Sequence, residues 1–183
     1  MSWFAIDEVV ELDDTGSVLN FFGFQWVRRT MTSLDHKIPP PVITILCAVL
    51  AWTLAHFTPE FAYALPARLP IAALFALTGL TLDVFCLLAF RKAKTTPSPL
   101  TPSKSTRIVQ TGPYAFSRNP MYLGLALLLI GLCIYLANPL ALLAVVVFVG
   151  YITRFQIIPE ERLLQTKFGD AYADYIRAVR RWI

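Results

Sequence analysis

The chain has 183 residues, of which 56% are hydrophobic and only 15% are charged. A soluble domain of this length rarely carries so few charges, and the apolar residues stand in long blocks, which excludes an ordinary soluble protein and indicates an all-α integral membrane protein. The formal net charge of +4 fits contact with a membrane surface, and no nucleic-acid-binding motif accompanies it, so we expect membrane lipids and no nucleic acid as partners. The three cysteines stand inside apolar runs without CxxC spacing, which predicts buried thiols and no metal site.

Residues 1–40 are predicted to form an N-terminal arm that does not cross the membrane. Between Gly16 and Met31 the chain is rich in aromatic and aliphatic side chains, but it also holds Arg28 and Arg29 and is too short and too polar to span a bilayer. We expect an interfacial helix whose aromatic side chains enter the headgroup region. The alternative is an arm that packs on the protein itself.

Residues 41–183 are predicted to form the membrane domain. Four apolar runs predict transmembrane helices at about 42–57, 69–90, 121–137 and 140–157, followed by cytoplasmic helices over 158–183. Asn138-Pro139 predicts a tight hairpin between the last two spans, and Gly169 predicts a break in the tail. These two spans are short against the usual ~20 residues, so either the bilayer thins or the helices continue beyond it.

The distribution of basic residues predicts the orientation. Lysines and arginines collect before the first span, between the second and third spans, and after the fourth, whereas the other two loops hold only Arg68. Because basic loops tend to stay in the cytoplasm, we expect both termini there.

The stretch 111–124 joins a basic, proline-rich segment to the third apolar run. Gly112-Pro113 and Asn119-Pro120 are turn signals, so we expect irregular backbone at the membrane boundary. Irregular backbone survives at that depth only where protein or a water-filled cavity surrounds it. The stretch therefore predicts a pocket.

Charged and aromatic side chains of separate segments are expected to meet on the same membrane face. Arg118 offers a planar donor fork for a carboxylate or phosphate, and Tyr114 and Tyr122 offer aromatic faces. Glu160 and Glu161 point about 100° apart on a helix, so we expect them to have different partners. The alternative to a ligand site is an interfacial network in which Arg118 pairs with one of these glutamates or with lipid phosphate.

Asp83 stands inside the second apolar run. A carboxylate at this depth is costly, so we expect it to face the bundle interior and assign it a possible contact with substrate. A structural hydrogen bond is the alternative.

Two motifs flank the predicted hairpin. The first reads Ile108-Val109-x-Thr111-Gly112-x-Tyr114, continued by Arg118-Asn119-Pro120-x-Tyr122-x-Gly124. The second reads Glu160-Glu161-x-x-Leu164-x-x-x-Phe168-Gly169-x-x-Tyr172-x-x-Tyr175-x-x-x-Val179-x-Arg181. Over roughly residues 91–183 the chain thereby resembles the isoprenylcysteine carboxyl methyltransferase and phospholipid methyltransferase superfamily. Thr95-Thr96 and the proline-rich segment that follows resemble its bacterial branch.

This resemblance implies S-adenosylmethionine as the methyl donor and a lipophilic or lipidated substrate, at the cytoplasmic face of a bacterial inner membrane. It implies catalytic roles for Arg118 and Glu160, and substrate contacts for Gln156 and Glu160. Where this chain has Gln156 the superfamily has an arginine, so the acceptor stays open between a carboxylate, an amine and a thiol. The cofactor contacts that it implies are Thr106, Arg107, Ile108, Val109, Tyr114, Asn119, Pro120, Met121, Tyr122 and Glu161.

Two other functions remain compatible with the sequence. Membrane sterol or enone reductases that use NADPH share a similar C-terminal pocket, although those chains are usually longer. A non-catalytic lipid-binding membrane protein is the second alternative. The sequence makes no prediction of the oligomeric state.

Overall fold

The computed structural model describes residue 35, residues 37–92 and residues 108–183. Every regular element in these ranges is helical, which confirms the all-α prediction for this part of the chain. The interfacial helix that we expect in the N-terminal arm, and the predicted cofactor contacts Thr106 and Arg107, lie outside the described residues.

Four helical segments coincide with the four predicted spans. They are α3 (Pro40–Phe57), α4 (Arg68–Lys92), α5 (Pro120–Leu136) and a continuous rod over residues 139–168. The rod consists of the 3-10 turn η4 (Pro139–Ala141), α6 (Leu142–Ile152), the π-helical segment η5 (Thr153–Ile157) and α7 (Ile158–Phe168). α3, α4 and the rod are long and apolar enough to cross a membrane, as expected of an integral membrane protein, whereas α5 has 17 residues.

The predicted hairpin at Asn138-Pro139 and the predicted break at Gly169 are both confirmed. The Asn138 side chain accepts a hydrogen bond from the Leu140 N–H at 2.9 Å and donates one to the Thr58 carbonyl at 2.8 Å, which closes the hairpin and ties it to the turn η1 (Pro59–Phe61). At the other end, Gly169 has a φ of 53° and separates α7 from α8 (Asp170–Ala178). The fourth span therefore continues as helix into α7, which carries charged residues and lies beyond the apolar run.

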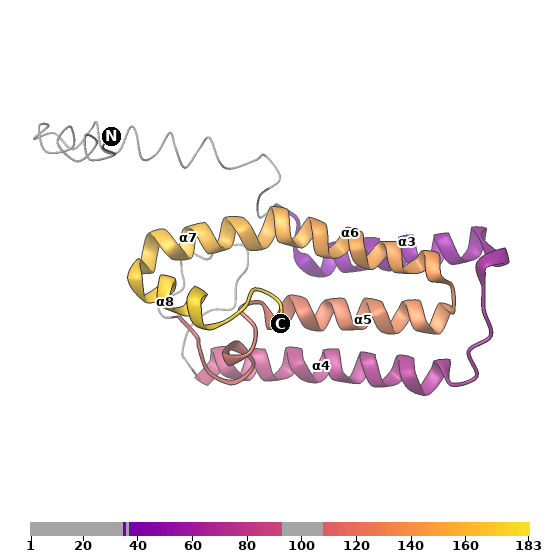
Figure 1. The fold of residues 1–183 in the computed structure, drawn as a ribbon, viewed down its shortest axis with the longest axis horizontal. Helices are drawn as coiled ribbons and strands as arrows, with labels where there is room; N and C mark the ends of the chain where they lie inside the picture. Colours follow the sequence, from indigo (N-terminus) through magenta and orange to yellow (C-terminus); the bar gives the residue numbers. More distant parts are fainter. Residues whose placement is uncertain (1–34, 36, 93–107) are drawn as a thin grey trace, which may run out of the picture. The chain divides into compact units, whose positions relative to one another are not determined.

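α5 is the central helix of the bundle, because it packs against α4 on one side and against α3 and α6 on the other (Figure 1). The larger hydrophobic core lies between α3, α5 and the rod, and Leu129, Phe148 and Ile152 are fully buried in it. A smaller cluster of Cys86, Val109 and Tyr114 joins the end of α4 to the segment before α5, which includes the turn η3 (Gly112–Ala115). This second cluster positions the candidate site.

Glycines set the distance between α4 and α5. A Cβ atom at Gly79 would lie 2.6 Å from the Gly124 carbonyl oxygen, and one at Gly131 would lie 2.9 Å from the Ala72 carbonyl oxygen. The two backbones therefore lie in direct contact, which is how small residues promote helix packing in membranes. At Gly124 the space that a Cβ would take is filled by the carboxylate of Asp83.

Gly79→Ala is therefore expected to push α4 away from α5 and to lower the thermal unfolding midpoint in detergent micelles, measured by circular dichroism. Overpacking of this kind costs about 1–3 kcal/mol. Gly150→Ala is the matched control, because a Cβ there has no neighbour within 4 Å, and alanine is the better helix former. Equal midpoints for the two variants would contradict the close contact.

Candidate active site

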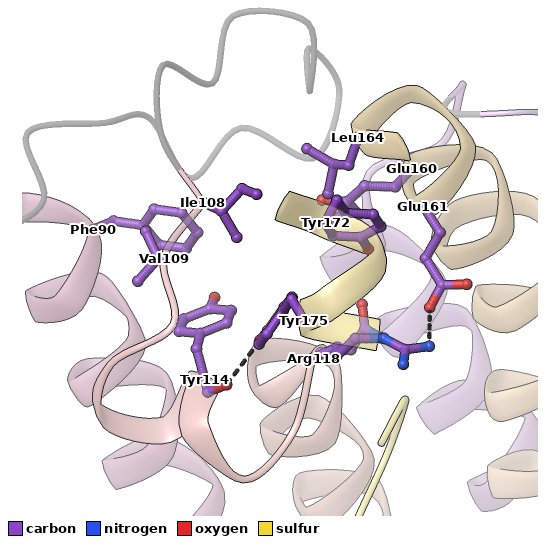
Figure 2. A pocket seen from close by; sticks show the side chains of 11 residues that line it. Phe90, Ile108, Val109, Tyr114, Arg118, Glu160, Glu161, Leu164, Tyr172 and Tyr175 are labelled. Carbon is purple, nitrogen blue, oxygen red and sulfur yellow. Dashed lines mark hydrogen bonds and ion pairs between the residues drawn. The ribbon is translucent and has the colours of Figure 1, made fainter. Parts of the chain in front are cut away.

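A pocket lies where α4 ends and α5 begins, and α7 and α8 form its other walls (Figure 2). The empty space between its walls, which includes the part open to solvent, is about 540 Å³. Its walls are formed by Phe90, Ile108, Val109, Tyr114, Arg118, Asn119, Glu160, Glu161, Leu164, Tyr172 and Tyr175.

The turn before α5 supplies one wall of the pocket. Gly112 has a φ of 65°, a conformation that suits glycine, and the chain then forms the single turn η3. This turn buries Tyr114, whose ring meets the edge of Phe90 at a centroid distance of 5.2 Å. Across the pocket, the Tyr175 hydroxyl donates a 2.7 Å hydrogen bond to the Tyr114 carbonyl (Figure 2). Helix α8 is thereby attached to the turn.

Glu161 forms ion pairs with two arginines. Its carboxylate accepts from Arg118 Nη2 at 2.7 Å, and from Arg181 Nε at 3.1 Å and Nη2 at 2.7 Å. Burial alone would raise the pKa of Glu161, but the hydrogen bonds from Arg181 and Arg118 outweigh it and hold that pKa below its ordinary value. Glu161 is therefore an ionised structural group of the pocket wall.

Most of the Arg118 guanidinium is engaged within the protein. Besides Glu161, it donates from Nη1 to the carbonyls of Ile176 and Val179, at 3.1 and 2.7 Å. Its Nε is buried without a hydrogen-bond partner in the described part of the chain. The interfacial network that was the alternative to a ligand site thus binds both terminal nitrogens of Arg118, and it leaves the buried Nε–H without a partner among the described residues.

Glu160 has a different environment from its neighbour. It accepts a 3.1 Å hydrogen bond from the Tyr122 hydroxyl, which is itself hydrogen-bonded to the side chain of Gln156. Burial, with a smaller contribution from the Glu161 charge, raises the pKa of Glu160 to about 7, against the lowering effect of the Tyr122 hydrogen bond. As the 100° separation predicted, the two glutamates have different partners, and Glu160 is poised to exchange a proton near neutral pH.

Comparison with known proteins assigns the part of the chain that holds this pocket to a family. Residues 67–171, more than half of the chain, match the family described as phospholipid methyltransferase. The chain belongs to this family. A relative from Haemophilus influenzae, described as an uncharacterized protein, is 48% identical over 63 residues, which make up 34% of this chain and all of that relative. No solved structure matches the chain.

Family membership implies that the protein is a membrane methyltransferase, and it confirms the resemblance noted in the sequence. The family match runs from the start of α4 to the start of α8. It therefore includes the turn before α5 and both glutamates, whereas the last twelve residues lie beyond it.

The pocket of this methyltransferase brings together seven residues with predicted roles: Ile108, Val109, Tyr114, Arg118, Asn119, Glu160 and Glu161. Tyr122 and Gln156 lie behind its wall, and the side chain of Gln156 is only 2% exposed. Pro120 is buried at the start of α5, and Met121 packs against the cluster around Cys86. Their contacts with cofactor or substrate stay predictions.

Asp83 does not line this pocket. Its carboxylate lies in the contact between α4 and α5 beside Gly124, and Oδ1 is buried without a hydrogen-bond partner among the described residues. The proposed contact of Asp83 with substrate stays a prediction.

Sequence reasoning gave no site role to four pocket residues, Phe90, Leu164, Tyr172 and Tyr175, although the last three belong to the second motif. Tyr172 and Tyr175 are three residues apart and so share one face of α8, next to a glycine that turns this helix back toward α4. That spacing was a readable signal. The position of Phe90, in contrast, depends on where α4 ends relative to η3.

Glu160→Gln is expected to change how stability depends on pH. Because the pKa of Glu160 is raised from 4.5 to about 7, the folded protein keeps a proton in this window that the unfolded chain releases, and stability falls as pH rises through it. Glu160→Gln lacks this effect, so the difference between its free energy of unfolding and that of wild type should rise by up to about 3 kcal/mol between pH 4 and pH 8.

The measurement is the thermal midpoint of wild type and variant across this pH range, with Glu60→Gln, in the exposed turn η1, as the control. If the difference between Glu160→Gln and wild type were the same at both ends of the range, the raised pKa would be refuted.

Proposed function

We propose that this methyltransferase moves a methyl group from S-adenosylmethionine to a lipophilic acceptor, at the membrane face where α4 ends and α5 begins. The observation that carries the proposal is the convergence on one pocket of aromatic rings, the protonatable Glu160 and the Nε of Arg118, which has no hydrogen-bond partner among the described residues.

The chemistry of the pocket walls fits the proposed donor. Tyr114, Tyr172 and Tyr175 provide aromatic surface for a purine ring and for a cation, and the carboxylates lie beside it. The Nε–H of Arg118 is a buried donor that a carboxylate of a ligand would satisfy. Bound there, S-adenosylmethionine would supply an electrophilic methyl group on a positively charged sulfur.

The protein's own contribution would be placement and one proton transfer. Holding two reactants in line removes much of the barrier to a displacement. Glu160, oriented by Tyr122 and indirectly by Gln156, is suited to take a proton from an acceptor amine or thiol. An acceptor carboxylate would need no base.

The partners of the arginines bear on the choice of acceptor. Among the described residues, Arg118 and Arg181 both bind Glu161, and Gln156 carries no charge. The positive charges of these two arginines are therefore not left free beside Glu160 to bind an anionic acceptor such as a carboxylate. This supports an acceptor that arrives neutral and loses a proton. A test of this choice has to exclude an isoprenylcysteine-like carboxylate as the methyl acceptor.

The orientation in the membrane belongs to this proposal as well. Arg91, Lys92 and Arg118 lie at the end of the described helices where the pocket is, whereas Arg68 lies at the far end, at the start of α4. By the positive-inside rule this supports a pocket on the cytoplasmic face, with both termini there, and the resemblance noted in the sequence supports a bacterial inner membrane.

Purified protein in detergent is expected to bind S-adenosylhomocysteine in isothermal titration, and Tyr172→Ala should weaken that binding about tenfold, because it removes aromatic contact worth ~1.5 kcal/mol. Tyr135→Ala is the matched control, since Tyr135 is exposed at the opposite end of α5. Absence of binding by wild type, or preferential binding of NADPH in a parallel titration, would reject the proposed donor.

Glu160→Gln is expected to keep the affinity for S-adenosylhomocysteine but to lower turnover at least about 100-fold, as removal of a general base does. Turnover is measured with methyl-labelled donor and native lipid extract, and the product is identified by mass spectrometry, with Glu60→Gln as control. Unchanged turnover would contradict the role of Glu160 as base and point to a carboxylate acceptor.

A further inference from the structure

The last residues of the chain lie against the turn that begins α5. The Arg118 backbone N–H donates to the Arg180 carbonyl at 3.0 Å, and the Asn119 side chain donates to the Arg181 carbonyl at the same distance. The Ser117 hydroxyl also donates to the Arg181 carbonyl, at 3.4 Å. Trp182 then packs against the larger core. The end of the chain is therefore a fixed part of the fold.

Side chains reinforce this attachment through a cluster of Arg118, Glu161 and Arg181, which we call the clasp. The carboxylate of Glu161 binds Arg181 through two nitrogens and Arg118 through one, and its side chain is 13% exposed. Paired arginine contacts of this kind are stronger and more directional than a contact with lysine.

The clasp holds helix α8 at its C-terminal end. Arg118 Nη1 binds the Ile176 and Val179 carbonyls, which belong to the last turn of α8 and to the residue after it. At its other end α8 is joined to α7 through Gly169, which has a φ of 53° and, as a glycine, no side chain to pack there. Since α8 supplies Tyr172 and Tyr175 to the pocket, the clasp, together with the hydrogen bond from Tyr175 to Tyr114, holds the pocket wall that α8 forms.

We propose that Arg181 is a positioning residue for the donor pocket: through Glu161 and Arg118 it holds α8 in the conformation that binds the methyl donor, without touching the donor itself. This inference rests on the proposed function. Arg181 does not line the pocket, and it is the last residue of the second motif, beyond residues 67–171 that match the family.

A positioning role predicts a specific kinetic pattern. If loss of Arg181 leaves α8 in place only part of the time, the apparent dissociation constant rises by the inverse of that fraction. Once the donor is bound, however, α8 is again in place and the reacting groups are unchanged. Affinity for the donor should therefore fall while turnover at saturating donor stays constant.

The test compares Arg181→Met with Arg180→Met in the full-length protein. Arg180 is adjacent and exposed, and the contact described above involves only its carbonyl, so it is a matched control. Arg181→Met should bind S-adenosylhomocysteine at least tenfold more weakly than the control, with turnover on native lipid extract at saturating donor within twofold. Arg181→Lys, which keeps the charge but not the fork, should fall between them.

Amide hydrogen exchange of residues 170–178 without ligand gives a second readout. Exchange should rise in Arg181→Met and not in Arg180→Met. Equal affinity and equal exchange in these two variants would overturn the inference, and so would a loss of turnover at unchanged affinity. Failure of wild type to bind S-adenosylhomocysteine would instead overturn the proposed function, and the exchange experiment would still decide whether the clasp holds α8.

Discussion

The turn before α5 interrupts the helical hydrogen bonding, and its buried polar groups, among them Ser117 and Arg118, need partners. Buried polar groups are costly without hydrogen bonds, and here the partners come from the protein. They come from far along the sequence: the carbonyls of Arg180 and Arg181 accept from the turn, and Tyr175 donates to it. Because the turn is satisfied from α8 and the chain end, these elements must fold over it, and the pocket is the space that they enclose with α4.

The two adjacent glutamates illustrate how the same side chain acquires different chemistry within one helical turn. Glu161 faces two guanidinium groups that lower its pKa, so it is charged at neutral pH and forms the ion pairs that hold the pocket wall. Glu160 faces a tyrosine hydroxyl, and burial raises its pKa to about 7. The division follows from the rotation of 100° per residue on a helix, which directs one carboxylate to the arginines and the other to the start of α5.

Much of the fold was predictable because its signals are local. Apolar runs gave the helices, Asn138-Pro139 gave the hairpin and Gly169 gave the break before α8. The partners of Arg118 were not predictable in the same way, since Glu161 and Val179 are 43 and 61 residues away in sequence and only the folded chain decides which of them reaches the guanidinium. From the sequence, the partner of the Arg118 guanidinium was expected to be a ligand, a lipid phosphate or a glutamate. In the structure, Arg118 Nη2 binds Glu161. Similarly, the burial of Asp83 against Gly124 depends on the register of α4 on α5.

The length of α5 relates the pocket to the bilayer. Its 17 residues rise about 25 Å at ~1.5 Å each, which is less than the ~30 Å hydrocarbon core of a typical bilayer. If the hairpin at Asn138 lies at the far interface, the start of α5 at Pro120 lies at or slightly inside the near boundary of the hydrocarbon. Tyr122 and Glu160 meet close to that start. With this geometry, the lipophilic acceptor that we propose would present its reactive group to Glu160 while its tail stays in the membrane, which avoids the cost of moving the tail into water.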